Sequence, residues 1–156
     1  MTAPVTGLEV VAGKFLAAEF FFVLIWATLL IHVSILAVLG TPDLGPVIAI
    51  YVGLMTLGGA MNGLGLLASA LTRNQIISVI VAFVGNLIFL LLDLLQRLFP
   101  RDPEAERFFD FIAVNNHFQN GYYRGVVDLR SIGLYLMGTV VFLYLTVQAL
   151  EARRWR

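Results

Sequence analysis

Few side chains in this sequence could carry out acid–base, metal or nucleophilic chemistry. The 156 residues include two histidines, His32 and His117, and no cysteine, which excludes thiolate nucleophiles and cysteine-bound metals. A metal site needs further ligands, and the two histidines lie in different settings, one in an apolar stretch and one in a polar stretch. No Ser–His–Asp arrangement or carboxylate pair stands out at a spacing that predicts catalysis. We therefore expect a protein that is not an enzyme and uses no cofactor.

The segment from Gly7 to Phe15 resembles a phosphate-binding loop only superficially. Such a loop has four residues between its glycines, followed by lysine and by a serine or threonine whose hydroxyl binds Mg²⁺. Here five residues separate Gly7 from Gly13, and Phe15 follows Lys14 where the hydroxyl would be needed. The sequence therefore predicts no ATP binding by this loop.

Three polar side chains lie inside apolar stretches, namely His32, Asn62 and Asn86. Ionisable groups are costly in such surroundings and are often functional, although an imidazole bonded to a neighbouring helix is the simpler explanation. Asparagine amides likewise often join helices by hydrogen bonds. We favour such helix-to-helix bonds for all three, and a role in a substrate path is the alternative.

Local spacing supports several further expectations. Gly59 and Gly63 are four residues apart, so two helices could approach closely there, either within the chain or between subunits. Lys14 and Glu19 are placed for a local ion pair. Among the remaining polar and aromatic residues, we expect an interfacial aromatic belt and a cap of the last helix. The belt would use Tyr122 and Tyr123, and the cap would use Asp128 or Ser131.

The amino-acid composition distinguishes a membrane protein from a water-soluble one. Hydrophobic residues make up 60% of it and charged residues 13%, against about 45–50% and about 25% in soluble proteins. A small soluble domain could not hide so much apolar surface from water. Ten basic residues balance ten acidic residues, so no basic face is available to bind nucleic acid. The sequence predicts an integral membrane protein.

Four uncharged runs define the elements that position these residues. A helix needs about 20 apolar residues to cross the hydrocarbon core of a bilayer, and backbone groups in lipid must be bonded within the segment. The sequence therefore predicts an all-α, polytopic fold with four transmembrane helices. The runs are Phe20–Pro42, Leu44–Thr72, Asn74–Leu92 and Ser131–Leu150.

The connections suggest how the chain is oriented. The long third connection, from Asp93 to Arg130, contains Glu104–Val114, whose apolar residues recur at helical spacing. We expect this stretch to be a short interfacial helix on the outside. The basic residues divide evenly between the two sides, but they are denser on the short segments that include both termini, which favours cytoplasmic termini.

Three motifs occur in the order and spacing of one family of membrane proteins. That family typically has Ser-Pro-Val and Glu-Ile-Val-x-Gly-Lys-Phe before a span, Ser-Ser-Leu-Thr-x-Asn-Gln between two spans, and a further motif before its last span. On these motifs the chain resembles ABC transporter permeases of the type-2 exporter class, close to the gliding-motility-associated permeases. The matching residues are Pro4–Val5, Glu9–Phe15, Ala68–Gln75, His117–Phe118 and Arg124–Arg130.

The resemblance implies one transmembrane permease domain over residues 1–156, in the bacterial cytoplasmic (inner) membrane. Residues 1–14 would be a cytoplasmic coupling segment, followed by spans at about 15–40, 46–71, 75–95 and 131–151. Its partners would be a separate ABC ATP-binding subunit, a second permease subunit (identical or different) and membrane lipid. The residues implied in coupling are Pro4, Leu8, Glu9, Gly13 and Lys14.

The chain departs from the family in its number of spans. Family members usually have six spans, two of them before the coupling segment, which suggests that two upstream spans are missing here or are supplied by another polypeptide. The alternative to a permease is a small membrane scaffold or channel-like subunit that assembles through glycine-rich helices without an ATPase. No residue pattern identifies a transported substrate.

Overall fold

The computed structural model describes residues 6–92 and 111–154, and within those ranges the chain is helical and contains no strand. The expectation of an all-helical fold is therefore confirmed at this level. Three helices are long and apolar enough to cross a membrane, which is compatible with a membrane-embedded protein. The elements are α1 (Gly7–Leu39), α2 (Leu44–Leu71), α3 (Gln75–Leu90), α6 (Val114–Asn120), the 3₁₀ turn η1 (Tyr122–Arg124) and α7 (Leu129–Arg154).

The third expected span differs from the other three. Helix α3 has 16 residues, about 24 Å at 1.5 Å per residue, which is shorter than the hydrocarbon core of about 30 Å. The rest of the expected span at 75–95 lies mostly outside the described residues, as does most of the interfacial helix expected at Glu104–Val114. The described part of the chain thus provides three candidate spans and one shorter apolar helix.

Side chains cap the helices at their first turns, where backbone N–H groups have no partner within the helix. Asp43 and Asn74 cap α2 and α3 in this way. At α7 the Asp128 carboxylate accepts from the backbone N–H of Arg130 at 2.9 Å, whereas the Ser131 hydroxyl donates back to the Asp128 carbonyl at 2.8 Å. Of the two residues expected to cap this helix, Asp128 is the one that does so.

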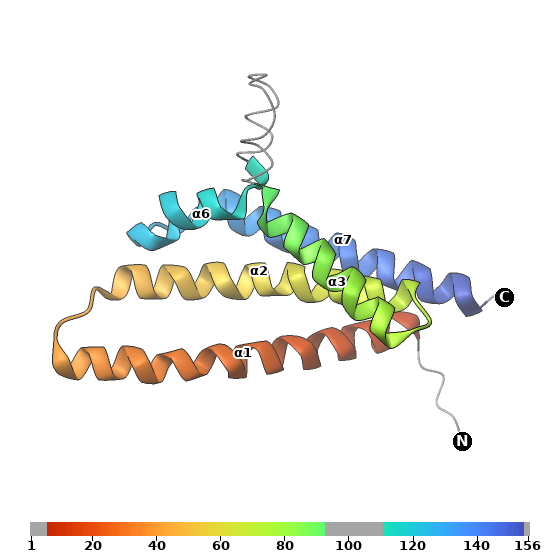
Figure 1. Ribbon diagram of the computed structural model, residues 1–156, viewed down its shortest axis with the longest axis horizontal. Coiled ribbons are helices and arrows are strands. Elements are labelled where there is room, and N and C mark those ends of the chain that lie inside the picture. The colour runs from red at the N-terminus through yellow and green to blue at the C-terminus, as the bar shows by residue number, and fades with distance from the viewer. Residues whose placement is uncertain (1–5, 93–110, 155–156) are drawn as a thin grey trace.

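Helix α2 occupies the centre of the bundle and contacts α1, α3, α7 and η1. Figure 1 shows α1, α2 and α7 running lengthwise, with α3 crossing them. The start of α1, the α2–α3 connection and the end of α7 lie at one end of the bundle, which we call the terminal end. The α1–α2 connection lies at the opposite end, which we call the distal end (Figure 1).

Glycines on α2 allow its neighbours to approach closely. Gly59 faces Thr139 of α7, and a Cβ built on Gly59 would lie 3.3 Å from the threonine hydroxyl. Gly63 faces Phe142 of α7, and a Cβ built on Gly63 would lie 3.2 Å from the Cβ of Phe142. Both glycines therefore support packing within the chain, because a larger residue would push α7 away.

The segment between α3 and α7 packs against α2. Val114, Phe118 and Tyr122 belong to the same buried cluster as Leu57 of α2 and Tyr135 of α7. The expectation of an interfacial belt is wrong for Tyr122, which is 0% exposed, because its ring lies directly over the backbone of Gly53 on α2. Tyr123, the other residue expected there, is 56% exposed.

Candidate functional site

The first turn of α1 is held by a reciprocal pair of hydrogen bonds. The Glu9 carboxylate accepts from the Thr6 backbone N–H at 2.8 Å, and the Thr6 hydroxyl accepts from the Glu9 backbone N–H at 3.3 Å. This arrangement is a capping box, which satisfies backbone donors at a helix start. From this cap the helix continues without a break to Leu39, so Leu8, Glu9, Gly13 and Lys14 belong to the same helix as the first candidate span.

The residues that the resemblance implies in coupling are largely uncovered where the structure describes them. Leu8 is 64% exposed, Glu9, Gly13 and Lys14 are also exposed, and nothing lies within 4 Å of a Cβ built on Gly13. Pro4 lies outside the described residues. This first stretch of α1 therefore presents a surface that other parts of the described chain do not occupy.

Glu19 is bonded across two helices. Its carboxylate accepts from the Asn62 side-chain amide of α2 at 2.9 Å, and both residues are half-buried. The described contact of Glu19 is thus with Asn62 and not the ion pair expected with Lys14. A carboxylate is costly in a bilayer, where few groups can solvate it. The bond from Asn62 supplies one such group and joins α1 to α2.

The other two polar residues of the apolar stretches have no such partner. His32 is exposed on α1, and Asn86 is half-buried on α3. Neither makes a hydrogen bond with any residue that the structure describes. The structure therefore does not bring His32, Asn62 and Asn86 together into one site.

A buried polar network joins α6, η1 and α7. The Tyr122 and Ser131 hydroxyls share a hydrogen bond of 2.7 Å, and the His117 ring nitrogen Nδ1 lies 2.9 Å from the Tyr135 hydroxyl. Ser131, Tyr135 and Thr139 are buried and recur every four residues along one face of α7. Sequence reasoning missed this network, although that spacing of polar residues within an uncharged run could have signalled it.

The environment of His117 also affects its charge. Burial lowers its pKa below the ordinary value of 6.5, because removing the imidazole from water disfavours the charged form. The Asp128 carboxylate and the backbone of Phe111 oppose that shift. His117 therefore loses its proton more readily in the folded chain than in the unfolded chain.

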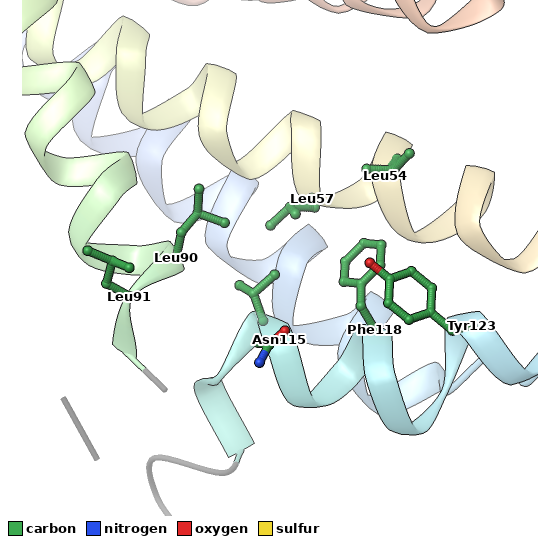
Figure 2. Close-up of a pocket in the computed structure, with 8 residues that line it drawn as sticks. Leu54, Leu57, Leu90, Leu91, Asn115, Phe118 and Tyr123 are labelled. Atoms are coloured by element: carbon green, nitrogen blue, oxygen red, sulfur yellow. The ribbon is translucent and has the colours of Figure 1, made fainter. Parts of the chain in front are cut away.

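An apolar recess of about 390 Å³ lies where α3 ends beside α2 and α6. Figure 2 shows side chains from these three helices and from η1 around it. Asn115 and Tyr123 are the two polar residues among those that line it, so its side chains offer mainly hydrophobic contact. Its lining residues are Leu54, Leu57, Leu90, Leu91, Val114, Asn115, Phe118 and Tyr123.

The described residues contain no candidate metal site. No three histidine, cysteine or carboxylate side chains in those ranges are grouped so that they could hold a metal ion. What the structure offers instead is an exposed helix start at the terminal end and polar bonds between helices. Comparison of the chain with protein-family models, with curated proteins and with solved structures gives no match.

Proposed function

We propose that this protein is the transmembrane permease subunit of an ATP-driven ABC exporter. Hydrolysis would take place on a separate ATP-binding subunit, and the exposed first turns of α1 would rest on it. The observation that carries the proposal is the unbroken helix from Gly7 to Leu39, capped by Thr6 and Glu9. A rigid helix that begins at a partner surface and continues through the bilayer can transmit a displacement of that partner.

The motif resemblance adds the rest of the proposed architecture. Four spans would cross the bacterial cytoplasmic membrane, with α3 extended to complete the third span and an interfacial helix outside. Both chain termini and the α2–α3 connection would then face the cytoplasm, on the side of the ATP-binding subunit. Two permease subunits surrounded by lipid would form the transport path.

The packing of α2 favours a permease over the alternative of a small scaffold or channel-like subunit. A scaffold would use its glycines to bind partner helices. On α2, however, Gly59 and Gly63 are covered by Thr139 and Phe142 of the same chain. Those glycine positions are therefore already occupied within the subunit.

The test separates the charge of Glu9 from its capping role. A capping box works with glutamine as well as with glutamate, so Glu9→Gln removes the charge and keeps the cap. Thr6→Ala keeps the charge and removes the cap, and Glu9→Lys reverses the charge. The three variants are compared in the complete transporter, at equal membrane levels, by co-purification of the ATP-binding subunit and by substrate-stimulated hydrolysis.

If Glu9 contacts the ATP-binding subunit, Glu9→Lys should lower both readouts most and Glu9→Gln should lower them several-fold. Thr6→Ala should have the smallest effect. If the Glu9→Lys variant co-purifies with the ATP-binding subunit and supports substrate-stimulated hydrolysis as the unaltered protein does, Glu9 has no docking role. Failure of any ATP-binding subunit to co-purify with the unaltered chain would contradict the proposed function itself.

A further inference from the structure

Another cavity, of about 510 Å³, lies between α6 and the stretch of chain that leads into α7. Its volume is within the range of small-molecule sites, about 300–1,000 Å³. Polar side chains make up most of its lining, unlike that of the apolar recess beside α3, and we call it the polar cavity. The lining residues are Asn116, His117, Asn120, Gly121, Val126, Val127 and Asp128.

Backbone contacts hold the two walls of the polar cavity together. The Val126 N–H donates to the Gly121 carbonyl at 3.1 Å, which ties the chain before α7 to the end of α6. Between these two residues, Gly125 has a φ of 77°, in the left-handed region that favours glycine. A Cβ built on Gly125 would lie 3.1 Å from the backbone nitrogen of Pro46. Because Pro46 belongs to the first turn of α2, this part of the cavity lies near the distal end.

Two of the lining side chains are held in position by hydrogen bonds. The Nδ1 atom of His117 lies 2.9 Å from the Tyr135 hydroxyl of α7. The Asp128 carboxylate accepts from the Arg130 backbone N–H at 2.9 Å. Side chains that are already fixed lose little conformational freedom when a ligand binds, so the polar cavity is suited to hold one.

The charge of the lining favours a cationic ligand. Asp128 is the one carboxylate among the lining residues, and none of them is lysine or arginine. Burial lowers the pKa of His117, so at neutral pH the imidazole is uncharged and does not offset the carboxylate. A phosphate or carboxylate group would therefore be repelled from the polar cavity.

The residue types also indicate which kind of cation fits. The described residues group no set of side chains that could hold a metal ion. A quaternary ammonium is typically held by aromatic rings, and no phenylalanine, tyrosine or tryptophan lines the polar cavity. A primary ammonium instead carries three N–H donors and needs hydrogen-bond acceptors.

The lining offers such acceptors. A carboxylate has two oxygens, and the described bond to the Arg130 N–H uses one oxygen of Asp128. The side chain of Asn120, which is exposed, makes no hydrogen bond with any residue that the structure describes. Its amide carbonyl is thus a second acceptor on the opposite wall of the polar cavity.

We propose that the polar cavity binds the primary ammonium group of a small organic molecule, with Asp128 as its ion-pair partner and Asn120 as a further acceptor. Two sources of this group are a free amine and the headgroup of an ethanolamine lipid. The inference goes beyond the proposed function, because it requires no ATP-binding subunit.

The two histidines of the chain provide the readout. Protein with isotope-labelled histidine is placed in phosphatidylcholine nanodiscs, which contain no primary amine, and is titrated with ethanolamine at constant pH and ionic strength. His117 lines the polar cavity and His32 does not, so the nuclear magnetic resonance signal of His117 should shift and saturate while that of His32 stays in place. The variant His32→Gln assigns the two signals. Ethylene glycol, in which a hydroxyl replaces the ammonium, is the matched control and should shift neither signal.

Matched variants test the ion pair separately from the helix cap. Asp128→Asn removes the charge but keeps the cap of α7, because asparagine caps helices as well as aspartate does. Asp43→Asn is the control, since Asp43 caps α2 at the distal end but does not line the polar cavity. We expect Asp128→Asn to weaken ethanolamine binding about tenfold or more, because a hydrogen bond to a charged group is lost. Asn120→Leu should weaken it several-fold, and Asp43→Asn should leave it unchanged.

Several results would overturn the proposal. They are a His117 signal that ethanolamine does not move, an equal shift with ethylene glycol, and ethanolamine binding to Asp128→Asn as tight as to the unaltered chain. Equal weakening in Asp128→Asn and Asp43→Asn would also overturn it. Because no measurement here involves the ATP-binding subunit, failure of this inference is distinguished from failure of the proposed function.

Nanodiscs that contain phosphatidylethanolamine distinguish the two sources of the ammonium group. If the lipid headgroup occupies the polar cavity, the His117 signal should already be shifted in these nanodiscs, and free ethanolamine should move it no further. If the cavity takes free amines only, the His117 signal should respond to ethanolamine equally in both kinds of nanodisc.

Discussion

The contact between Gly53 and Tyr122 allows a sharp test of how the connecting segment is held on α2. A Cβ added at Gly53 would lie 2.8 and 2.9 Å from two carbons of the Tyr122 ring. That ring is fully buried and hydrogen-bonded to Ser131, so it cannot easily move aside. Gly53→Ala should therefore displace η1 from α2.

The expected magnitude follows from the crowding. Adding a methyl group to a well-packed position typically costs about 1–3 kcal/mol. Gly65→Ala is the matched control on the same helix, because nothing lies within 4 Å of a Cβ built on Gly65. The control should be neutral or should gain up to about 1 kcal/mol, since alanine favours helix more than glycine does. The two variants should thus differ by about 1–4 kcal/mol in free energy of unfolding.

Unfolding by SDS titration in mixed micelles measures the free energies, and the near-ultraviolet circular dichroism reports tyrosine packing. The variant Gly53→Ala should unfold at lower SDS than Gly65→Ala and should lose part of its tyrosine signal. Replacing the ring by Tyr122→Leu should make the second change at Gly53 much less costly than it is alone. Equal stability of Gly53→Ala and Gly65→Ala would refute the packing described for η1.

Three further outcomes are expected. Folding lowers the pKa of His117, so the unfolded chain binds a proton more readily than the folded chain, and the stability should fall as the pH drops through about 6.5. Thermal unfolding between pH 8 and 5 measures this fall. The variant His117→Gln should remove the pH dependence. Tyr122→Phe deprives the buried Ser131 hydroxyl of one partner and should cost about 1 kcal/mol in the SDS titration. Asn62→Leu removes the donor to Glu19 and should destabilise by about 1–3 kcal/mol in the same assay, whereas an unchanged midpoint would show that the bond is not needed.

The features predictable from the sequence are those that depend on one segment at a time. The lack of charges from Phe20 to Pro42 predicts a long apolar helix, and Asp128 lies where a helix cap is expected. Glu9 follows Thr6 by three residues, which is the spacing of a capping box, and its bond with Thr6 stabilises the first turn of α1. In each case the physical cause lies within a few residues of its effect.

The features that the sequence did not reveal depend on contacts between distant residues. Residues 114–120 contain asparagines, histidine and glutamine, which is typical of a loop in water. They pack on α2 because Gly53 leaves room for the ring of Tyr122, about 70 residues later in the chain. The bond between Glu19 and Asn62 likewise requires the angle between two helices, so local spacing suggested Lys14 instead.

The pairing of α2 with α7 has a consequence for the synthesis of the chain. Thr139 follows Gly59 by 80 residues, and ribosomes add about 5–20 residues per second. The glycine face of α2 therefore enters the bilayer roughly 4 to 16 s before the side chains that cover it. During that interval Gly59 and Gly63 lack the α7 side chains that cover them in the folded chain, so the nascent chain is most vulnerable to wrong pairing before α7 is made.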